Sequence, residues 1–291
     1  MLRKYKIFPV LILLFVSCNE SPTISKEPGN DFKAYWYSGK AEISSYELKQ
    51  NRYNQTRNGK SVLVFVTEPF KPNKQVKADG SDASNVNVLK LNSTKKFLTG
   101  IYPYSIMNSS FYPVTDDQNA IKLTTTVQEW CGHVFAQLNN RSEFEIKSYS
   151  YFEKEGDQSF KMKKVPLEAE VWNKIRINPS NLGTGQFEML PSFEYLRLKH
   201  KEIKPYKVTG AITSKKGMMT YSLEYPELAR RLSITFQNEF PYIIESWIEK
   251  SADGYGAQAK RINTIKSAYW GENSNGDEKK REKLGLPTTY Q

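Results

Sequence analysis

Apolar and polar residues alternate with a period of two over most of the body of this chain. The apolar positions are rich in Tyr, Phe, Val and Ile, and Thr is frequent beside them. Because successive side chains of a strand point to opposite faces, this period predicts strands that each bury one face. Ala41 to Tyr53 reads as one long strand, and Ser61 to Glu68, apolar on both faces, as a central one. The turn Arg57-Asn58-Gly59-Lys60 predicts a tight hairpin between them.

The same pattern predicts about a dozen further strands, so the chain must manage many antiparallel neighbours. They cover Asn85 to Leu91, Lys95 to Tyr102, Ala120 to Gln128, His133 to Leu138, Ser142 to Phe152, Gln186 to Leu190, Phe193 to Lys199, Tyr206 to Thr213, Met218 to Tyr225, Leu232 to Gln237, Ile243 to Glu249 and Ala259 to Tyr269.

One segment has the spacing of a helix. In Val165 to Ile177, the residues Leu167, Val171 and Ile175 are four apart, and Pro166 stands in the first turn, where its missing N–H costs nothing. We therefore expect a mainly β fold of two antiparallel β lobes, a curled sheet or half-barrel-like, with one helix between them. The concave face of such a sheet either holds an apolar ligand or is filled by side chains of the helix and loops.

The expected domains follow the chain in order. Residues 1–17 are a lipoprotein signal peptide, 18–31 a flexible tether, 32–164 the N-terminal β lobe, 165–270 the helix plus the C-terminal β lobe, and 271–291 a polar tail. The tether prediction rests on a polar composition with two prolines and a glycine.

The N-terminus predicts where the protein resides. A basic start and the apolar stretch Ile7 to Val16 run into Ser17-Cys18, which is typical of a signal peptide that is cleaved before a lipidated cysteine. The apolar stretch is shorter than the roughly 20 residues that a membrane-spanning helix needs. We expect a lipid anchor on Cys18 and a place in the bacterial cell envelope. Asn19 is not an acidic retention signal, which favours the outer membrane.

Cysteine count and charge limit the mature chain further. Cys131 is the second of two cysteines, so a lipidated Cys18 leaves no pair for a disulfide. Without the three basic residues of the signal, 39 Lys and Arg face 31 Asp and Glu, a net charge of +8. Such a surface favours anionic neighbours such as lipid headgroups and acidic glycans, and an envelope address argues against nucleic acid.

Glu129-Trp130-Cys131-Gly132-His133 brings an acid, a thiol and an imidazole together. A cysteine nucleophile needs a base within hydrogen-bonding reach, which makes Cys131, His133 and Glu129 candidate catalytic residues. The alternative is a small buried thiol beside an ordinary sheet histidine. His200 is the one other imidazole, too few ligands for a zinc site, and we expect no metal and no cofactor.

Tyr102 and Tyr104 flank a proline in Thr99 to Ser105. A cluster of aromatic rings in a loop can stack on a sugar ring or enter lipid headgroups, and it can equally be a packed strand end. Several enzyme classes lack their motif, since there is no Gly-x-Ser-x-Gly, no phosphate loop, no Gly-x-Gly-x-x-Gly and no His-Glu-x-x-His.

Four segments carry a resemblance that covers essentially the whole chain: Leu63 to Phe70, Thr99 to Ser105, Gln128 to His133 and Ser267 to Trp270. They resemble a family of bacterial envelope lipoproteins of unknown function, some of which bear the name septum formation inhibitor Maf. Maf proteins are cytoplasmic α/β nucleotide pyrophosphatases with a Ser-x-Ser-Pro-Arg-Arg loop near the N-terminus. Here Arg230-Arg231 follows Leu228-Ala229 within a β-rich half, which argues against that activity.

The sequence thus favours a membrane-anchored, non-enzymatic envelope lipoprotein. Its strands would bind an apolar or anionic envelope component, such as a lipid or glycan, or a partner protein. The alternative is an envelope hydrolase that uses Cys131 and His133.

Overall fold

The computed structural model describes residues 28–252 and 254–289. The signal peptide and Cys18 lie outside these residues. The first half of the chain forms α1 (Asn30–Trp36), β1 (Ala41–Arg52), β2 (Gln55–Lys71), β3 (Val76–Lys77), β4 (Val86–Thr99), β5 (Tyr102–Pro113), β6 (Lys122–Glu129), β7 (Gly132–Asn140), β8 (Phe144–Ser150) and β9 (Gln158–Met162).

The second half begins with short helical pieces and continues with strands. Its elements are η1 (Glu168–Glu170), α2 (Val171–Ile177), η2 (Pro179–Asn181), β10 (Gly185–Met189), α3 (Phe193–Leu198), β11 (Tyr206–Lys215), β12 (Met218–Tyr225), η3 (Pro226–Leu228), β13 (Arg230–Gln237), β14 (Ile244–Ser251), β15 (Gly254–Ser267), η4 (Tyr269–Gly271) and η5 (Asp277–Leu284). The η elements are 3-10 helices.

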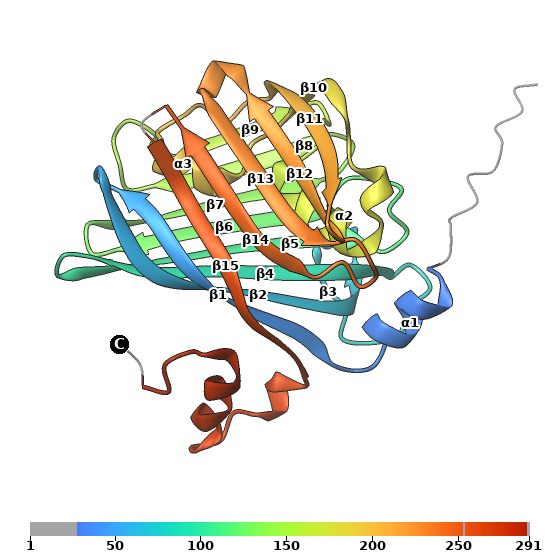
Figure 1. The fold of residues 1–291 in the computed structure, drawn as a ribbon. Coiled ribbons are helices and arrows are strands. Elements are labelled where there is room, and N and C mark those ends of the chain that lie inside the picture. Colours follow the sequence, from blue (N-terminus) through green and yellow to red (C-terminus); the bar gives the residue numbers. More distant parts are fainter. Residues whose placement is uncertain (1–27, 253, 290–291) are drawn as a thin grey trace, which may run out of the picture.

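All described strands belong to one large antiparallel sheet, which confirms the predicted mainly β fold (Figure 1). The order is β10-β11-β12-β13-β14-β15-β1-β2-β4-β5-β6-β7-β8-β9, with the short β3 beside β2. β1 pairs with β15 from Ala41 opposite Ser267 to Gln50 opposite Ala257. The two predicted lobes are therefore the two wings of a single sheet, joined by strands from opposite ends of the chain.

The sheet curls around the helical segment between its wings. Figure 1 shows α2 and α3 inside the curl, with β13 to β15 in front and β5 to β8 behind. Alternate residues of each strand point into this interior. Among them, Phe65, Leu91, Leu123 and Leu232 all belong to one main core, together with residues of both helices. The end strands β9 and β10 do not pair with each other.

The hairpin between β1 and β2 turns five residues earlier than predicted. Tyr53 and Asn54 both have positive φ, 56° and 57°, as a two-residue hairpin turn requires. Asn58 and Gly59 lie within β2, opposite Lys49 and Leu48. Gly59 serves a close approach instead, because a Cβ atom there would lie 2.2 Å from the carbonyl oxygen of Lys96.

The prediction of one helix was incomplete. α2 ends at Ile177 as expected, but Val165 to Leu167 precede it without helical structure, and Leu167 forms an isolated bridge with Leu190. The predicted strand Phe193 to Lys199 was wrong. It forms α3, because the Ser192 hydroxyl accepts a hydrogen bond from the Tyr195 N–H and begins a helix that is buried on nearly all sides.

Two other segments differ from the expected boundaries. The predicted strands Asn85 to Leu91 and Lys95 to Tyr102 are largely one strand, β4, and the aromatic segment beyond Thr99 continues as β5. The polar tail packs on the convex face, where Leu284 and Leu286 join Ala41 and Ile43 in a small second cluster.

Candidate functional site

A cavity of about 420 Å³ lies inside the curl, at the end of the sheet that carries the β1–β2 hairpin. Its walls come from both wings, with β4, β5 and β6 on one side and β13, β14 and β15 on the other, and from the segment η1 to α3. The volume falls within the range of about 300–1,000 Å³ that is usual for small-molecule sites.

Arg230 forms the charged floor of this cavity. Its Nη1 bonds Glu168 Oε2, and its Nη2 bonds Glu168 Oε1 at 2.9 Å and Glu249 Oε2 at 2.6 Å. The Tyr225 hydroxyl donates to Glu168 Oε2 at 2.8 Å, and the guanidinium carbon lies 4.1 Å from the centre of the Tyr195 ring. One arginine thus holds two carboxylates that come from η1 and β14.

Burial and charge act in opposite directions on this floor. Burial raises the pKa of Glu168, but the Arg230 guanidinium and its hydrogen bonds outweigh that effect and hold the pKa below its usual value. Burial lowers the pKa of Arg230, and the two carboxylates raise it well above its usual value. Burial, followed by the Glu168 charge, raises the pKa of Tyr225. Glu168 and Arg230 therefore both stay charged at neutral pH.

A second polar group lines the opposite wall. Lys95 Nζ lies 2.6 Å from Glu194 Oε1, and Asn108 Nδ2 donates to Glu194 Oε2 at 2.7 Å. The Thr125 hydroxyl donates to Asn108 Oδ1 at 2.8 Å. Through these contacts, α3 is fixed to β4, β5 and β6 by charge and hydrogen bonds.

The remaining lining combines apolar and aromatic side chains with polar ones such as Ser93, Ser109 and Thr124. Trp172 and Trp247 meet edge to face, with ring centroids 5.2 Å apart. Further apolar lining residues come from β4, β6, β13 and the segment before and within α3: Leu91, Leu123, Leu190, Phe193, Leu198 and Leu232. A molecule in this space would contact both hydrocarbon surface and a few placed polar groups.

The mouth of the cavity is at the β1–β2 turn. Tyr53, Asn54 and His200 line the cavity and are exposed. Arg52 Nε donates to the Tyr104 hydroxyl at 3.1 Å, and Arg52 Nη1 donates to the Leu198 carbonyl at 3.0 Å. These contacts join β1, β5 and α3 at the rim.

The two predicted binding tyrosines have different positions. Tyr104 is buried and stacks on Phe97, with centroids 5.0 Å apart and planes at 6°. The Tyr104 hydroxyl accepts the hydrogen bond from Arg52 Nε and is also hydrogen-bonded to the Tyr53 hydroxyl at 2.9 Å, so Tyr104 supports the rim. Tyr102 is half-buried, and its ring centroid lies 6.4 Å from that of the exposed Trp130. Neither tyrosine lines the cavity.

Cys131 lies in the turn between β6 and β7, where it is exposed, and His133 is exposed on β7. The Cys131 N–H donates to Glu129 Oε2 at 2.6 Å. The hydrogen bond between the thiol and the Glu129 carboxylate raises the pKa of Cys131, which disfavours a thiolate. The three predicted catalytic residues are close in sequence but lie outside the cavity.

A second, smaller cavity of about 350 Å³ lies on the other side of α3, against β6, β7 and β8. Its polar group is Glu155, which bonds His200 Nδ1 at 2.5 Å and lies 3.6 Å from Arg197 Nη1. Burial raises the pKa of Glu155, but these two partners and Ser150 bring it below its usual value. His200 contributes to both cavities.

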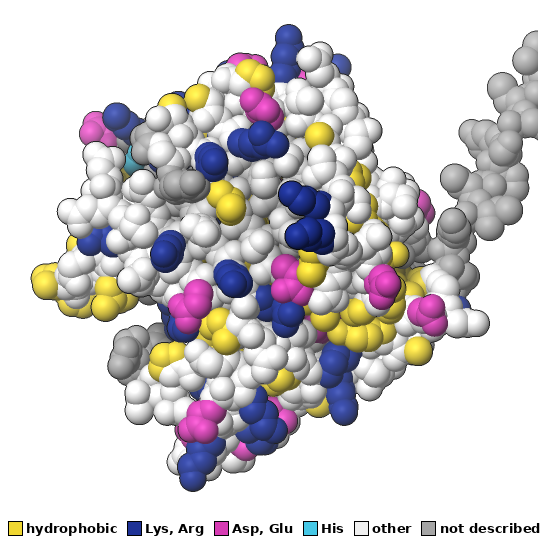
Figure 2. Space-filling model, in the orientation of Figure 1, with side chains coloured by type: hydrophobic (Ala, Val, Ile, Leu, Met, Phe, Trp, Pro, Cys, Tyr) yellow, Lys and Arg dark blue, Asp and Glu magenta, His cyan; other side chains and the backbone are white. Residues whose placement is uncertain are grey.

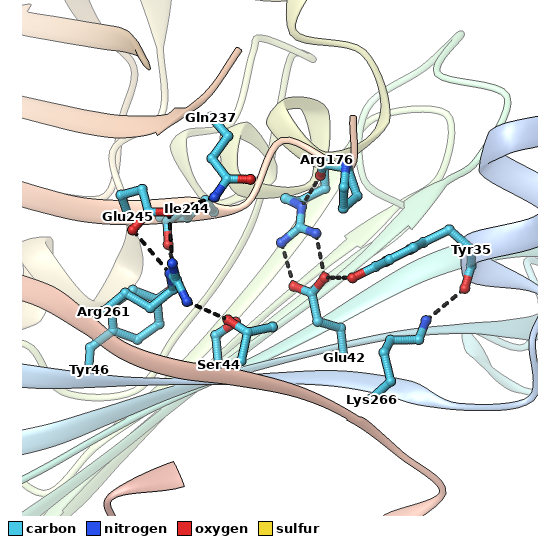
Figure 3. Close-up of polar contacts among 12 residues, drawn as sticks. Tyr35, Glu42, Ser44, Tyr46, Arg176, Gln237, Ile244, Glu245, Arg261 and Lys266 are labelled. Atoms are coloured by element: carbon cyan, nitrogen blue, oxygen red, sulfur yellow. Dashed lines mark hydrogen bonds and ion pairs between the residues drawn. The ribbon is translucent and has the colours of Figure 1, made fainter. Parts of the chain in front are cut away.

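The opposite end of the interior contains a comparable ion pair (Figure 3). Arg176 on α2 bonds both carboxylate oxygens of Glu42 on β1, at 2.5 and 2.6 Å. Arg176 Nε donates to the Pro241 carbonyl at 2.7 Å, and the Tyr35 hydroxyl donates to Glu42. Neither Arg176 nor Glu42 lines either cavity.

Sequence reasoning missed the charged residues of the cavity. Two of these residues could have been found from the sequence. Arg230 alternates with the apolar residues Leu232 and Ile234, and Glu249 alternates with Trp247. A charged residue on the same face of a strand as its apolar residues indicates a buried ionic group. Glu168 and Glu194 lie in helical segments and carry no such signal.

Surface charge shows no single binding patch on the face in Figure 2. Lys and Arg side chains are scattered there among acidic ones, and hydrophobic side chains gather at the left end, where the β4–β5 hairpin lies in Figure 1. Within the described residues, no group of three or more His, Cys, Asp or Glu could hold a metal ion. The helices of residues 28–252 and 254–289 are all too short or too polar to span a bilayer.

Comparisons with known proteins give no relative from which a function could be taken: no family model and no curated protein matches the chain.

Proposed function

We propose that this protein is a lipid-anchored protein of the bacterial cell envelope, with the outer membrane favoured, that binds a small amphipathic molecule inside its curled sheet. The observation that carries the proposal is the cavity of about 420 Å³ on the concave face, whose walls combine leucine and aromatic side chains with fixed polar groups. Small-molecule sites have this composition. The anchor on Cys18 is supported by the sequence pattern of the N-terminus.

The charges along the cavity favour binding over catalysis. Arg230 is engaged by two carboxylates, and Lys95 by Glu194, so these two cations are already paired. The alternative from the sequence, an envelope hydrolase, needs Cys131 and His133 to act at a surface turn with a thiol whose pKa is raised. Cys131 would then resist thiol-reactive probes at neutral pH more than a free cysteine does, whereas rapid labelling would favour the hydrolase.

The test of binding is to identify what the protein carries. The full chain is purified from membranes of the expressing cells, extracted with organic solvent and examined by mass spectrometry. We expect an amphipathic compound in near-stoichiometric amount. Ser93→Phe, which places a ring in the cavity, should remove it, whereas Thr94→Phe on the opposite face of β4 should not.

An extract with no compound, or equal amounts from both variants, would contradict ligand binding in this cavity. The anchor has a separate test. Cells fed an alkyne-tagged fatty acid should label the wild-type protein, and Cys18→Ser should abolish the label. Label retained in Cys18→Ser would place the lipid elsewhere.

A further inference from the structure

The charged residues that line the cavity differ in how exposed their side chains are. Arg230 is about 1% exposed, whereas the side chain of Glu249 is 17% exposed. Glu249 lies on the face of β14 that points into the curl, and it lines the cavity, so its exposed part faces that space. A ligand can therefore reach the Glu249 carboxylate but not the guanidinium behind it.

Arg230 is poorly suited to receive an anionic group. Its two terminal nitrogens make three bonds to carboxylates. An anionic headgroup would have to displace one of them and would face the other carboxylate at short range. Such a like-charge contact in a buried site is strongly unfavourable.

The ionic groups of the floor and wall carry a net negative charge. Three carboxylates, Glu168, Glu249 and Glu194, are paired with two cations, Arg230 and Lys95, which leaves 2 − 3 = −1 on the floor and wall. Arg52 and Lys199 also line the cavity, so the negative charge is local to the floor and wall. Glu249 Oε2 is held by Arg230, and Oε1 has no hydrogen bond among the described residues. The surplus charge thus belongs to the carboxylate that a ligand can reach.

The neighbours of Glu249 also suit a cation. Trp247 is two residues away on the same face of β14, and the ring of Trp172 meets it edge to face. Indole faces attract ammonium groups, most strongly where water is excluded. On the paired strand, a Cβ atom at Gly256 would lie 2.5 Å from Glu249 Oε1, so the glycine gives the carboxylate its room.

We infer that the ligand of this cavity carries an ammonium group, which binds Glu249 beside Trp247, on an apolar body that lies along the leucines of the walls. This inference rests on the proposed function. It reverses the expectation from net charge, because the basic surface would attract anions while the interior selects a cation. Arg52 places a positive charge at the mouth, so ionic strength must be physiological in any comparison of charged probes.

The experiment compares three probes with the same tail. Hexylamine, hexanol and hexanoate are titrated calorimetrically into the detergent-solubilised full chain, with detergent alone as the blank. At pH 7 the amine is protonated and the acid is ionised. We expect hexylammonium to bind about tenfold more tightly than hexanol, as one charge-assisted hydrogen bond would give, and hexanoate to bind more weakly than hexanol.

Three variants assign the preference to one carboxylate. Glu249→Gln should lower the affinity for hexylammonium about tenfold and leave that for hexanol unchanged, while Glu249→Asp should retain most of the preference. Glu245→Gln is the matched control, because Glu245 lies on the same strand but bonds Arg261 and Gln237 away from the cavity. It should bind all three probes as the wild type does.

The outcomes separate the two proposals. If hexanol binds and hexylammonium has no advantage, or if Glu249→Gln keeps the advantage, the ammonium inference is wrong and the binding function stands. If none of the three probes binds to the wild type, the proposed function itself fails.

Discussion

Two arginines anchor the helical segment to opposite ends of the curled sheet, and their surroundings differ. Arg176 bonds Pro241 and Glu42 through Nε, Nη1 and Nη2, lies against the rings of Trp36 and Phe65, and lines neither of the two cavities. We call this the closed end and the surroundings of Arg230 the cavity end. Arg230 has a buried Nε without a partner and a second carboxylate, Glu249, that faces a cavity. All three nitrogens of the Arg176 guanidinium are therefore bonded at the closed end, whereas at the cavity end Glu249 Oε1 has no hydrogen bond among the described residues.

This difference indicates that the ion pair of Arg176 is purely structural, whereas the ion pairs of Arg230 lie where a ligand can bind. A buried ion pair with all its hydrogen bonds made can only hold two elements together, since it offers no group to a ligand. The floor at Arg230 also holds η1 to β13, but it adds a reachable charge and aromatic walls. The two ends therefore predict different responses to mutation.

The largest effect is expected at the closed end. Arg176→Met leaves the Glu42 carboxylate buried without its cation, which should lower the free energy of unfolding by about 3–5 kcal/mol. Chemical denaturation measures it. The double variant Arg176→Met with Glu42→Leu should recover most of the loss, because it removes the stranded charge as well. A single variant as stable as the wild type would show that the pair is not buried as described.

Loss of one partner of Arg230 at the cavity end should lower the free energy of unfolding less than Arg176→Met does. The size of this loss should depend on pH. Glu168→Gln should cost about 2–3 kcal/mol at pH 7, because Arg230 keeps Glu249. The pKa of Glu168 is lowered on folding, so its contribution is present above about pH 4.5 and is lost as the pH falls through the folded value.

Unfolding curves of wild type and Glu168→Gln from pH 7 to pH 3 test that dependence. The two free energies should converge in acid. Glu47→Gln is the control, because Glu47 is an exposed carboxylate paired with Lys60 and should follow the wild type throughout. A constant gap between wild type and Glu168→Gln down to pH 3 would exclude a lowered pKa.

Mutations at the mouth of the cavity should lower the free energy of unfolding less than those at the floor. Tyr104→Phe removes the hydroxyl that joins Arg52 and Tyr53, which should cost about 1 kcal/mol of unfolding free energy. Tyr149→Phe, at an exposed tyrosine on β8, should have almost no effect. Equal effects of the two variants would mean that the rim contacts do not stabilise the fold.

The strands were predictable from sequence because burial of one face is a local pattern, as in Met218 to Tyr225, which β12 matches throughout. The pairing of β1 with β15 was not, since it joins residues more than 200 positions apart and leaves no local signal. Gly59 misled the turn prediction because a glycine serves a close contact as well as a turn.

The site was harder to predict than the sheet. Phe193 to Leu198 alternates like a strand, and only the Ser192 cap and burial inside the curl explain why it is a helix. Cys131 and His133 are adjacent in sequence, yet the chemistry inside the cavity comes from residues far apart, such as Glu168 and Glu249. Their proximity depends on the curl of the sheet, which no local pattern encodes.

The smallest effect on stability is expected at Glu249, and it sharpens the comparison most. Glu249→Gln leaves Arg230 with both bonds to Glu168, and the glutamine oxygen can still accept from Nη2. The free energy of unfolding should therefore change by less than about 1 kcal/mol, as is usual for partly exposed pairs. Thermal and chemical denaturation measure this.

A loss at Glu249 as large as that at Arg176 would mean that both ends are structural in the same sense. A small loss together with altered probe binding would instead mean that this carboxylate is held in place for a ligand. The closed end cannot give that result, because every change to Glu42 or Arg176 strands a buried charge or removes a filled hydrogen bond.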